Sequence, residues 1–392
     1  MFFSLEKTAN SKFPHRYQLG QLILNTDAGW KVIDTGSRIL VYKGYADHAD
    51  LDSIVSNLPH TVSGNFCVFE YNLDSQQIEI FTNQYRGFLI WHQSGTRLSN
   101  LLQEDYTIWN DSSVVVDQLL MLHETKVDIV GSIDINCLDL ATAVDLVHEL
   151  LSDKIKNFIN HNKLPLRVYC SGGVDSMLVY SYIKTFTDNY ELVLENRFQY
   201  DEFWCKNSRL ISDSFWGYQQ IHHWVDPCVL TSGAPGDEFM LRNPSTTNLW
   251  LMYHGTSIPN LLKTQDIKHK FFDLPHNQQL FEKHCWDKEL DPVMKLSTNA
   301  FYRYLCNIVT NDCQHWHLGN TLTFTPLRDL EMFKIFLRLN IKDAIPQILS
   351  SNISKELIKR NDANLLNYLS DDKDTGEEFA NLVGLLPGSN PT

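Results

Sequence analysis

Long apolar runs, cysteine pairs and a basic patch are all missing from this sequence of 392 residues. No segment approaches the roughly 20 consecutive apolar residues that a membrane-spanning helix needs. Met1–Lys7 lacks the basic start and apolar core of a signal peptide. The eight cysteines include no Cys-x-x-Cys pair, a pattern typical of reduced thiols. These absences argue against a membrane or secreted protein and predict a cytoplasmic one.

Positive charge is also scarce. Lysine and arginine number 33 against 47 aspartates and glutamates, so the formal net charge is −14. An acidic surface repels phosphate backbones and anionic lipids, and we therefore expect neither nucleic acid nor a membrane as partner. The 43% of apolar residues and 20% of charged ones are typical of a soluble globular enzyme. The length predicts two domains, and nothing in the sequence indicates an oligomeric state.

The stretch 18–110 has the pattern of antiparallel strands. Short β-branched or aromatic runs alternate with turn residues such as Asp27-Ala28-Gly29. Because these runs follow one another directly, antiparallel sheets are favoured over crossover units. The clearest runs are Gln21–Leu24, Arg38–Tyr42, Asn65–Tyr71 and Ile78–Thr82.

The pattern changes near residue 139. Apolar residues recur at helical spacing from Leu140 to Phe158, which predicts one long amphipathic helix. A short apolar strand, Leu166–Cys170, follows, and helix and strand then alternate as in a layered parallel α/β domain. Residues 245–340 read as mostly helical, and the acidic stretch from Ser370 reads as a mobile tail.

The strand Leu166–Cys170 runs directly into Ser-Gly-Gly-Val-Asp-Ser at 171–176, and a helical stretch follows. A glycine-rich turn at a helix N-terminus directs several N–H groups to one place and lets the backbone approach a ligand closely. Ser171 and Ser176 add hydroxyl donors. Asp175 would repel phosphates unless Mg²⁺ lay between them, since this cation binds carboxylate and phosphate oxygens together. The segment therefore predicts a site for a polyphosphate with Mg²⁺.

This loop differs from a Walker loop, because it has no Gly-Lys-Ser/Thr step. Transfer of a γ-phosphate is therefore not expected. A strand-to-helix turn of small residues without any ligand is the simpler alternative. The strand before the loop and the helix after it favour the ligand-binding interpretation.

Ser-Gly-Gly-Val-Asp-Ser after a strand resembles the pyrophosphatase loop (PP-loop) of the family that contains asparagine synthetase, GMP synthetase and argininosuccinate synthetase. The resemblance implies that ATP is split into AMP and pyrophosphate through an adenylated intermediate. It also implies that ATP and Mg²⁺ are bound by Ser171, Gly172, Gly173, Asp175 and Ser176, with Asp175 as a Mg²⁺ ligand.

A second segment narrows the resemblance to the asparagine synthetase branch. Thr231–Glu238 follows the apolar strand Cys228–Leu230 and is similar to that branch's Ser-Gly-x-Gly-x-Asp-Glu segment. The resemblance implies that Asp237 is the second Mg²⁺ ligand and that Ser232 and Gly233 border the adenylate. An ordinary turn carboxylate after Pro-Gly is the alternative for Asp237.

Two later segments fit the same branch. Thr325–Asp329 is similar to its Pro-Phe-Leu-Asp segment, and Ser354–Arg360 is similar to its Lys-x-x-Leu-Arg run. By resemblance Lys355 contacts pyrophosphate and joins Asp175 and Asp237 as the third catalytic residue. A fixed ammonium would stabilise the charge of the departing pyrophosphate. A solvated helix lysine is the alternative for Lys355.

The N-terminal half resembles the core of that branch's glutaminase domain in Gly64–Phe69, Ile80–Phe88 and Leu98–Asn100. A working glutaminase needs a cysteine directly after the initiator Met, because its thiol attacks and its α-amine is the base. Phe2 stands at that position. The oxyanion segment Asn-Gly aligns with Lys43-Gly44, which lacks the amide donor. We therefore expect a degenerate domain without glutaminase activity, as in beta-lactam synthetase and lasso peptide cyclase.

Ala234 departs from the branch as well. Asparagine synthetase has Glu at this position, and beta-lactam synthetase has a Tyr that takes part in proton transfer, which alanine cannot do. The spacing between Asp175 and Asp237 is also shorter than this branch usually has. These departures argue against aspartate as the substrate and against lactam closure, and they leave open altered or lost catalysis.

Together these features predict an α/β protein of two domains, an antiparallel β-sandwich of degenerate glutaminase type and a parallel-sheet PP-loop synthetase domain with added helices. The expected ranges are 1–115 for the first domain, 116–138 for a connector, 139–369 for the second domain and 370–392 for a flexible tail. The predicted function is an AMP-forming ligase that adenylates a small-molecule or peptide carboxylate and transfers it to an amine or ammonia. Two alternatives remain: a non-catalytic nucleotide-binding protein, and a PP-loop enzyme that activates a base oxygen.

Overall fold

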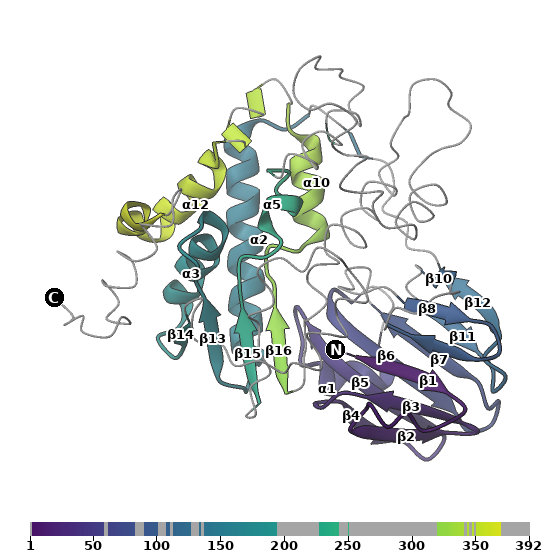
Figure 1. Cartoon of the computed structure of the whole chain (residues 1–392). Coiled ribbons are helices and arrows are strands. Elements are labelled where there is room, and N and C mark those ends of the chain that lie inside the picture. Colours follow the sequence, from purple (N-terminus) through teal and green to yellow (C-terminus); the bar gives the residue numbers. More distant parts are fainter. Residues whose placement is uncertain are drawn as a thin grey trace. The chain divides into compact units, whose positions relative to one another are not determined.

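The structure, a computed structural model, describes residues 2–58, 62–82, 90–100, 107–109, 113–126, 133–134, 137–193, 227–242, 250, 320–340, 343–344, 347–348 and 350–369. By its internal contacts the chain divides into two compact units. The division passes through the first residues of β15 (Cys228–Thr231) and β16 (Thr321–Phe324). Figure 1 shows the described elements of each unit.

The first unit is built on two six-stranded sheets, each with antiparallel pairing. The first sheet contains β1 (Phe3–Glu6), β2 (His15–Leu19), β3 (Leu22–Thr26), β8 (Ile90–Gln93), β9 (Arg97–Ser99) and β10 (Thr107–Trp109), in the order β10-β8-β9-β1-β3-β2. The second contains β4 (Lys31–Asp34), β5 (Arg38–Ala46), β6 (Gly64–Asn72), β7 (Ile78–Thr82), β11 (Ser113–Val116) and β12 (Leu122–Lys126), in the order β12-β11-β7-β6-β5-β4.

The two sheets of the first unit share one apolar core. Phe3 from the first sheet and Phe69 from the second meet edge to face, with ring centroids 5.0 Å apart. The opposite face of β5 and β6 packs against α1 (Leu51–Ile54) and the 3₁₀ turn Val55–Asn57. Because both faces of β6 are covered, nearly all its residues are buried. This explains why β6 reads as a continuous apolar run in the sequence.

The second unit contains a four-stranded sheet in the order β14-β13-β15-β16, where β13 is Leu166–Tyr169 and β14 is Glu191–Val193. β13 pairs in parallel with β14 on one side and with β15 on the other. Parallel neighbours bring the loops after β13 and β15 to the same edge of the sheet. These are the two loops that the sequence indicated as the nucleotide site.

Among the residues that the structure describes, the second unit contains the helices α2 (Leu140–His161), α3 (Val174–Phe186), α10 (Leu330–Arg338) and α12 (Asn352–Asp362), and the 3₁₀ segment η4 (Ala363–Tyr368) follows α12. α3 packs against both α2 and α12, and α10 packs against α2. Asp139 caps α2 by accepting a hydrogen bond from the Thr142 N–H. The predicted amphipathic helix is confirmed, since its apolar stripe from Ala143 to Phe158 is buried.

The antiparallel strands expected early in the chain and the parallel strands expected later are both confirmed. β12 falls inside the range 116–138 that was expected to be a connector, and it pairs with β11 as part of the second sheet. Of the range 245–340, β16 is a strand and α10 a helix, and most of the remainder lies outside the described residues. The tail 370–392 also lies outside them. Among the described helices, none is long and apolar enough to cross a bilayer.

Candidate nucleotide site

The loop at 171–176 connects β13 to α3. Gly172 has a φ of +83°, a conformation that glycine adopts without strain. The Ser176 hydroxyl donates to the Gly173 carbonyl at 2.9 Å and accepts from the Ser171 N–H at 3.2 Å, so the loop closes on itself. α3 begins after Gly173 with no side-chain cap on its first turn. The first N–H groups of α3, at the positive end of its dipole, are therefore left for an anion.

The second loop touches the backbone of the first. A Cβ added to Gly233 would lie 2.2 Å from the Asp175 carbonyl carbon and 2.3 Å from the Ser176 nitrogen, so only glycine fits. A Cβ added to Gly236 would lie 2.5 Å from the Asp175 carboxyl carbon. Ser232, beside Gly233, is buried and its hydroxyl accepts from the Ala234 N–H at 3.3 Å. The two loops predicted from sequence thus form one continuous surface.

Asp175 and Asp237 meet at a single nitrogen atom. Nη2 of Arg242 donates to Asp175 Oδ2 at 2.6 Å and also contacts Asp237 Oδ1. Asp237 lies in the short helix α5 (Gly236–Phe239), and the chain turns back after it, with the Arg242 N–H donating to the Asp237 carbonyl at 2.7 Å. The structure therefore brings the two predicted aspartates together, with a cation already between them.

The two carboxylates differ in their surroundings. Burial raises the pKa of Asp175 to about 7, Arg242 opposes this rise, and the neighbouring charge of Asp237 adds to it. The side chain of Asp237 is 54% exposed. Asp175 Oδ1 is buried, and it has no hydrogen-bond partner among the residues that the structure describes. One carboxylate is thus buried with an unused oxygen, and the other faces solvent.

α12 contributes to the same place. Nη1 of Arg242 donates to Ser351 Oγ at 2.6 Å, and Ser351 is the residue from which α12 starts. Lys355 lies one helical turn later, with its N–H donating to the Ser351 carbonyl at 2.9 Å. Lys355 is therefore one turn from a residue that contacts Arg242. This places only the backbone of Lys355 near Ser351, and its contact with pyrophosphate stays a prediction.

Asp329, at the end of the segment Thr325–Asp329, has a supporting role. Its carboxylate caps α10 by accepting from the N–H groups of Glu331 at 2.8 Å and Met332 at 3.2 Å. It also pairs with Lys154 on α2 at 2.8 Å, and both side chains are buried. Burial acts to raise the pKa of Asp329, but Lys154 and the cap hydrogen bonds hold it below its ordinary value. This pair joins α2 to the start of α10.

Asp175 and Asp237 are the two carboxylates that the sequence predicts as Mg²⁺ ligands. The described residues contain no group of three or more side chains that could hold a metal ion. Mg²⁺ at nucleotide sites usually takes one or two carboxylates and completes its shell with phosphates and water. Asp175, with its unused buried oxygen, and the exposed Asp237 match that requirement. The residues fit Mg²⁺ that arrives with phosphates and do not fit a metal held by protein groups alone.

In the first unit, Lys43 and Asp27 form a buried ion pair at 3.0 Å beside the N-terminal strand. Asp27 Oδ1 accepts from the Phe2 N–H at 3.0 Å and from the Trp30 indole at 2.8 Å. Burial acts to raise the pKa of Asp27, but Lys43 and these donors keep it below its ordinary value. Lys43 is therefore paired with a carboxylate that also accepts a hydrogen bond from the Phe2 N–H.

Arg242, Ser351 and Lys154 are the site residues that the sequence interpretation missed. Lys154 had a signal, because it lies on the buried face of α2 between Leu151 and Phe158 at helical spacing. No sequence pattern indicated Arg242 or Ser351, because their hydrogen bond depends on how distant segments pack. Burial raises the pKa of the Cys170 thiol, next to the loop, to about 11, which disfavours its thiolate form at neutral pH.

No protein-family model matches this chain, and no curated protein matches it either.

Proposed function

We propose that this chain is an ATP-dependent ligase that adenylates a carboxylate, releases pyrophosphate and passes the acyl group to an amine or ammonia. The single observation that carries the proposal is the convergence of Asp175 and Asp237 on one cation position beside the uncapped start of α3. Two separate motifs that resemble one enzyme branch thus meet at one place, as a shared nucleotide site requires. The proposed protein has a degenerate glutaminase-like domain and a PP-loop synthetase domain, with ATP and Mg²⁺ bound in the second.

Each predicted residue has a role in this proposal. The N–H groups at the start of α3 and the hydroxyls of Ser171 and Ser176 hold phosphate oxygens. Asp175 and Asp237 would hold Mg²⁺, which when bound supplies charge stabilisation to the phosphates. Lys355 stabilises the negative charge of pyrophosphate as it leaves. Ser232 and Gly233 border the adenosine monophosphate portion.

Adenylation suits a carboxylate because the free carboxylate is a poor electrophile. Its oxygen attacks the α-phosphorus, the bond from that phosphorus to the bridging oxygen breaks, and pyrophosphate leaves with the electron pair. The resulting mixed anhydride has AMP as a good leaving group, which the amine displaces. Ala234 offers no acid or base for that second step, so we expect an amine acceptor that is nucleophilic without a base from this position.

The test is exchange of labelled pyrophosphate into ATP with pools of small-molecule and peptide carboxylates. We expect a pool-dependent exchange and the formation of AMP. In Lys355→Gln the exchange rate should fall about 100- to 1000-fold, as for loss of one charge-stabilising group. Lys359→Gln is the matched control, since Lys359 lies on the same helix, is 61% exposed and pairs only loosely with Glu356 at 3.8 Å.

Release of ADP in place of AMP would contradict the proposal, because it would mean transfer of the γ-phosphate. Equal rates of pyrophosphate exchange in the Lys355 and Lys359 variants would show that Lys355 does not act at the site. ATP binding without AMP formation in any pool would favour the non-catalytic alternative, which Ala234 and the shortened motif spacing support.

Glutamine is not expected to be a nitrogen donor. Phe2 supplies no thiol, and Lys43 is committed to Asp27, so the first unit has neither the nucleophile nor the oxyanion amide. The purified chain should release no glutamate from glutamine above the buffer background, measured with a coupled glutamate assay. Steady glutamate release that scales with protein concentration would show this prediction to be wrong.

A further inference from the structure

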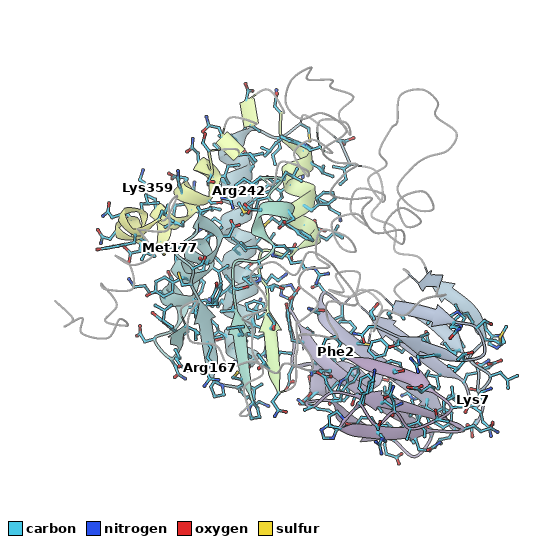
Figure 2. All side chains as sticks on the ribbon, viewed as in Figure 1. Phe2, Lys7, Arg167, Met177, Arg242 and Lys359 are labelled. Atoms are coloured by element: carbon cyan, nitrogen blue, oxygen red, sulfur yellow. The ribbon has the colours of Figure 1, made fainter. Side chains whose placement is uncertain are left out.

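Arg242 occupies a position that the predicted motifs do not account for. Its side chain is only 8% exposed, and Figure 2 labels it among the elements at one end of the second unit's sheet. Nη2 contacts both Asp175 and Asp237, and Nη1 donates to Ser351 at 2.6 Å. Its Nε is buried without a hydrogen-bond partner among the described residues. Both terminal nitrogens of the guanidinium therefore have partners, and its Nε–H is an unused donor.

The point between the two carboxylates can hold one cation. Mg²⁺ shared by Asp175 and Asp237 would take oxygens of the same two carboxylates that Nη2 now contacts. A guanidinium and a divalent ion on the same carboxylates repel each other. Arg242 must therefore leave the carboxylates before both can bind the metal.

A displaced guanidinium finds its best partner nearby. The uncapped start of α3 and the loop at 171–176 form the proposed phosphate site, and Asp175 belongs to that same loop. Arginine binds phosphate through two parallel N–H groups, a geometry that matches its binding to carboxylate. A short shift from carboxylate to phosphate keeps every charge paired.

We propose that Arg242 is an exchange residue: without nucleotide it neutralises Asp175 and Asp237, and when a nucleoside triphosphate brings Mg²⁺ the guanidinium moves onto the phosphates. This inference rests on the proposed function, which supplies the nucleotide. It makes nucleotide and metal bind together, because Arg242 keeps the two carboxylates from sharing a metal until phosphates accept the guanidinium. Arg242 is thus a positioning residue that controls when the metal site forms.

The test separates metal binding from nucleotide binding in the full chain. Mn²⁺ alone is titrated by EPR, since it takes the same oxygen ligands, and a non-hydrolysable ATP analogue with Mg²⁺ is titrated by calorimetry. In Arg242→Gln we expect Mn²⁺ alone to bind at least tenfold more tightly, because the carboxylates lose their resident cation. The analogue should bind at least tenfold more weakly, because the phosphates lose the guanidinium.

Two further variants complete the experiment. Arg242→Lys keeps the charge, so Mn²⁺ alone should bind as weakly as to the wild type, while only part of the nucleotide affinity returns. Arg167→Gln is the matched control, since Arg167 also pairs with a carboxylate, Glu191 at 2.7 Å, and Figure 2 labels it at the opposite end of the sheet. It should change neither affinity. Thermal melting of each variant verifies that it is folded.

In Arg242→Gln, tighter binding of Mn²⁺ together with weaker binding of the ATP analogue would support the exchange of Arg242 from carboxylate to phosphate. A purely structural arginine would weaken both affinities or change neither, and either result overturns the inference. A wild type that binds no analogue contradicts the proposed function, and the inference falls with it. The third possible result is that the wild type binds the analogue but Arg242→Gln binds Mn²⁺ no more tightly than the wild type. This result would overturn the exchange and leave the proposed function standing.

Discussion

Asp175→Asn is expected to lower the rate of pyrophosphate exchange into ATP by about a thousandfold or more. A metal that stabilises developing charge contributes several kcal/mol, and each 1.36 kcal/mol is about tenfold in rate. Asparagine keeps the shape of Asp175 and removes the charge that holds the metal. The amide keeps one oxygen and replaces the other by an NH₂ group, which is a donor and not a metal ligand. The rate is measured with labelled pyrophosphate at saturating ATP.

Asp145→Asn is the control for this variant. Asp145 lies on α2, pairs with Arg360 at 2.7 Å and is 63% exposed, so it should exchange pyrophosphate at the wild-type rate. Exchange in Asp175→Asn within tenfold of the wild type would mean that this carboxylate does not hold the metal. The nucleotide site as described would then be wrong, whatever the other residues do.

Lys154→Met is expected to reduce the free energy of unfolding by about 3–5 kcal/mol, the usual cost of leaving one member of a buried ion pair alone. Asp329 would remain buried, with its carboxylate facing an apolar side chain. The measurement is unfolding in urea at pH 7. Lys334→Met is the control, because its pair with Glu331 at 2.7 Å lies at the surface and such pairs contribute less than about 1 kcal/mol.

At acidic pH, the free energies of unfolding of Lys154→Met and of the wild type should differ less than at pH 7. The pKa of Asp329 is lowered in the folded protein. The stability that its pair contributes is therefore present above its unfolded pKa of about 4 and is lost as the pH falls through the folded pKa. A protonated Asp329 needs no partner, so the two proteins should approach one another below pH 4. A difference that stays constant down to pH 3 would show that the lost stability comes from packing and not from charge.

Much of the second unit followed from local patterns. The stripe from Leu140 to Phe158 predicted α2, and the run Leu166–Cys170 predicted β13, because spacing and length distinguish a helix from a short strand. Parallel pairing then implied that the loops after β13 and β15 meet at one edge. Their contact at Gly233 agrees with that implication. The sequence therefore predicted that these two loops lie close together before their contact was known.

Three features depended on packing between distant segments. Arg242 reaches Asp175 and Ser351 only because the chain turns back after α5, and no motif marks that turn. Ser351 meets it through a left-handed conformation at φ 57°, which serine rarely adopts. In the first unit, β1 (Phe3–Glu6) was missed because its four residues are all buried and show no alternation. In the first sheet it lies between β3 and β9.

The backbone contact at Gly233 has a consequence for how this protein could change. At Gly233 the two loops approach each other through main-chain atoms of Asp175 and Ser176. A substitution at Ala234 would therefore change a side chain beside this contact and leave the contact itself unchanged. In the proposed ligase, the choice of acceptor could then change without a change in how ATP is held.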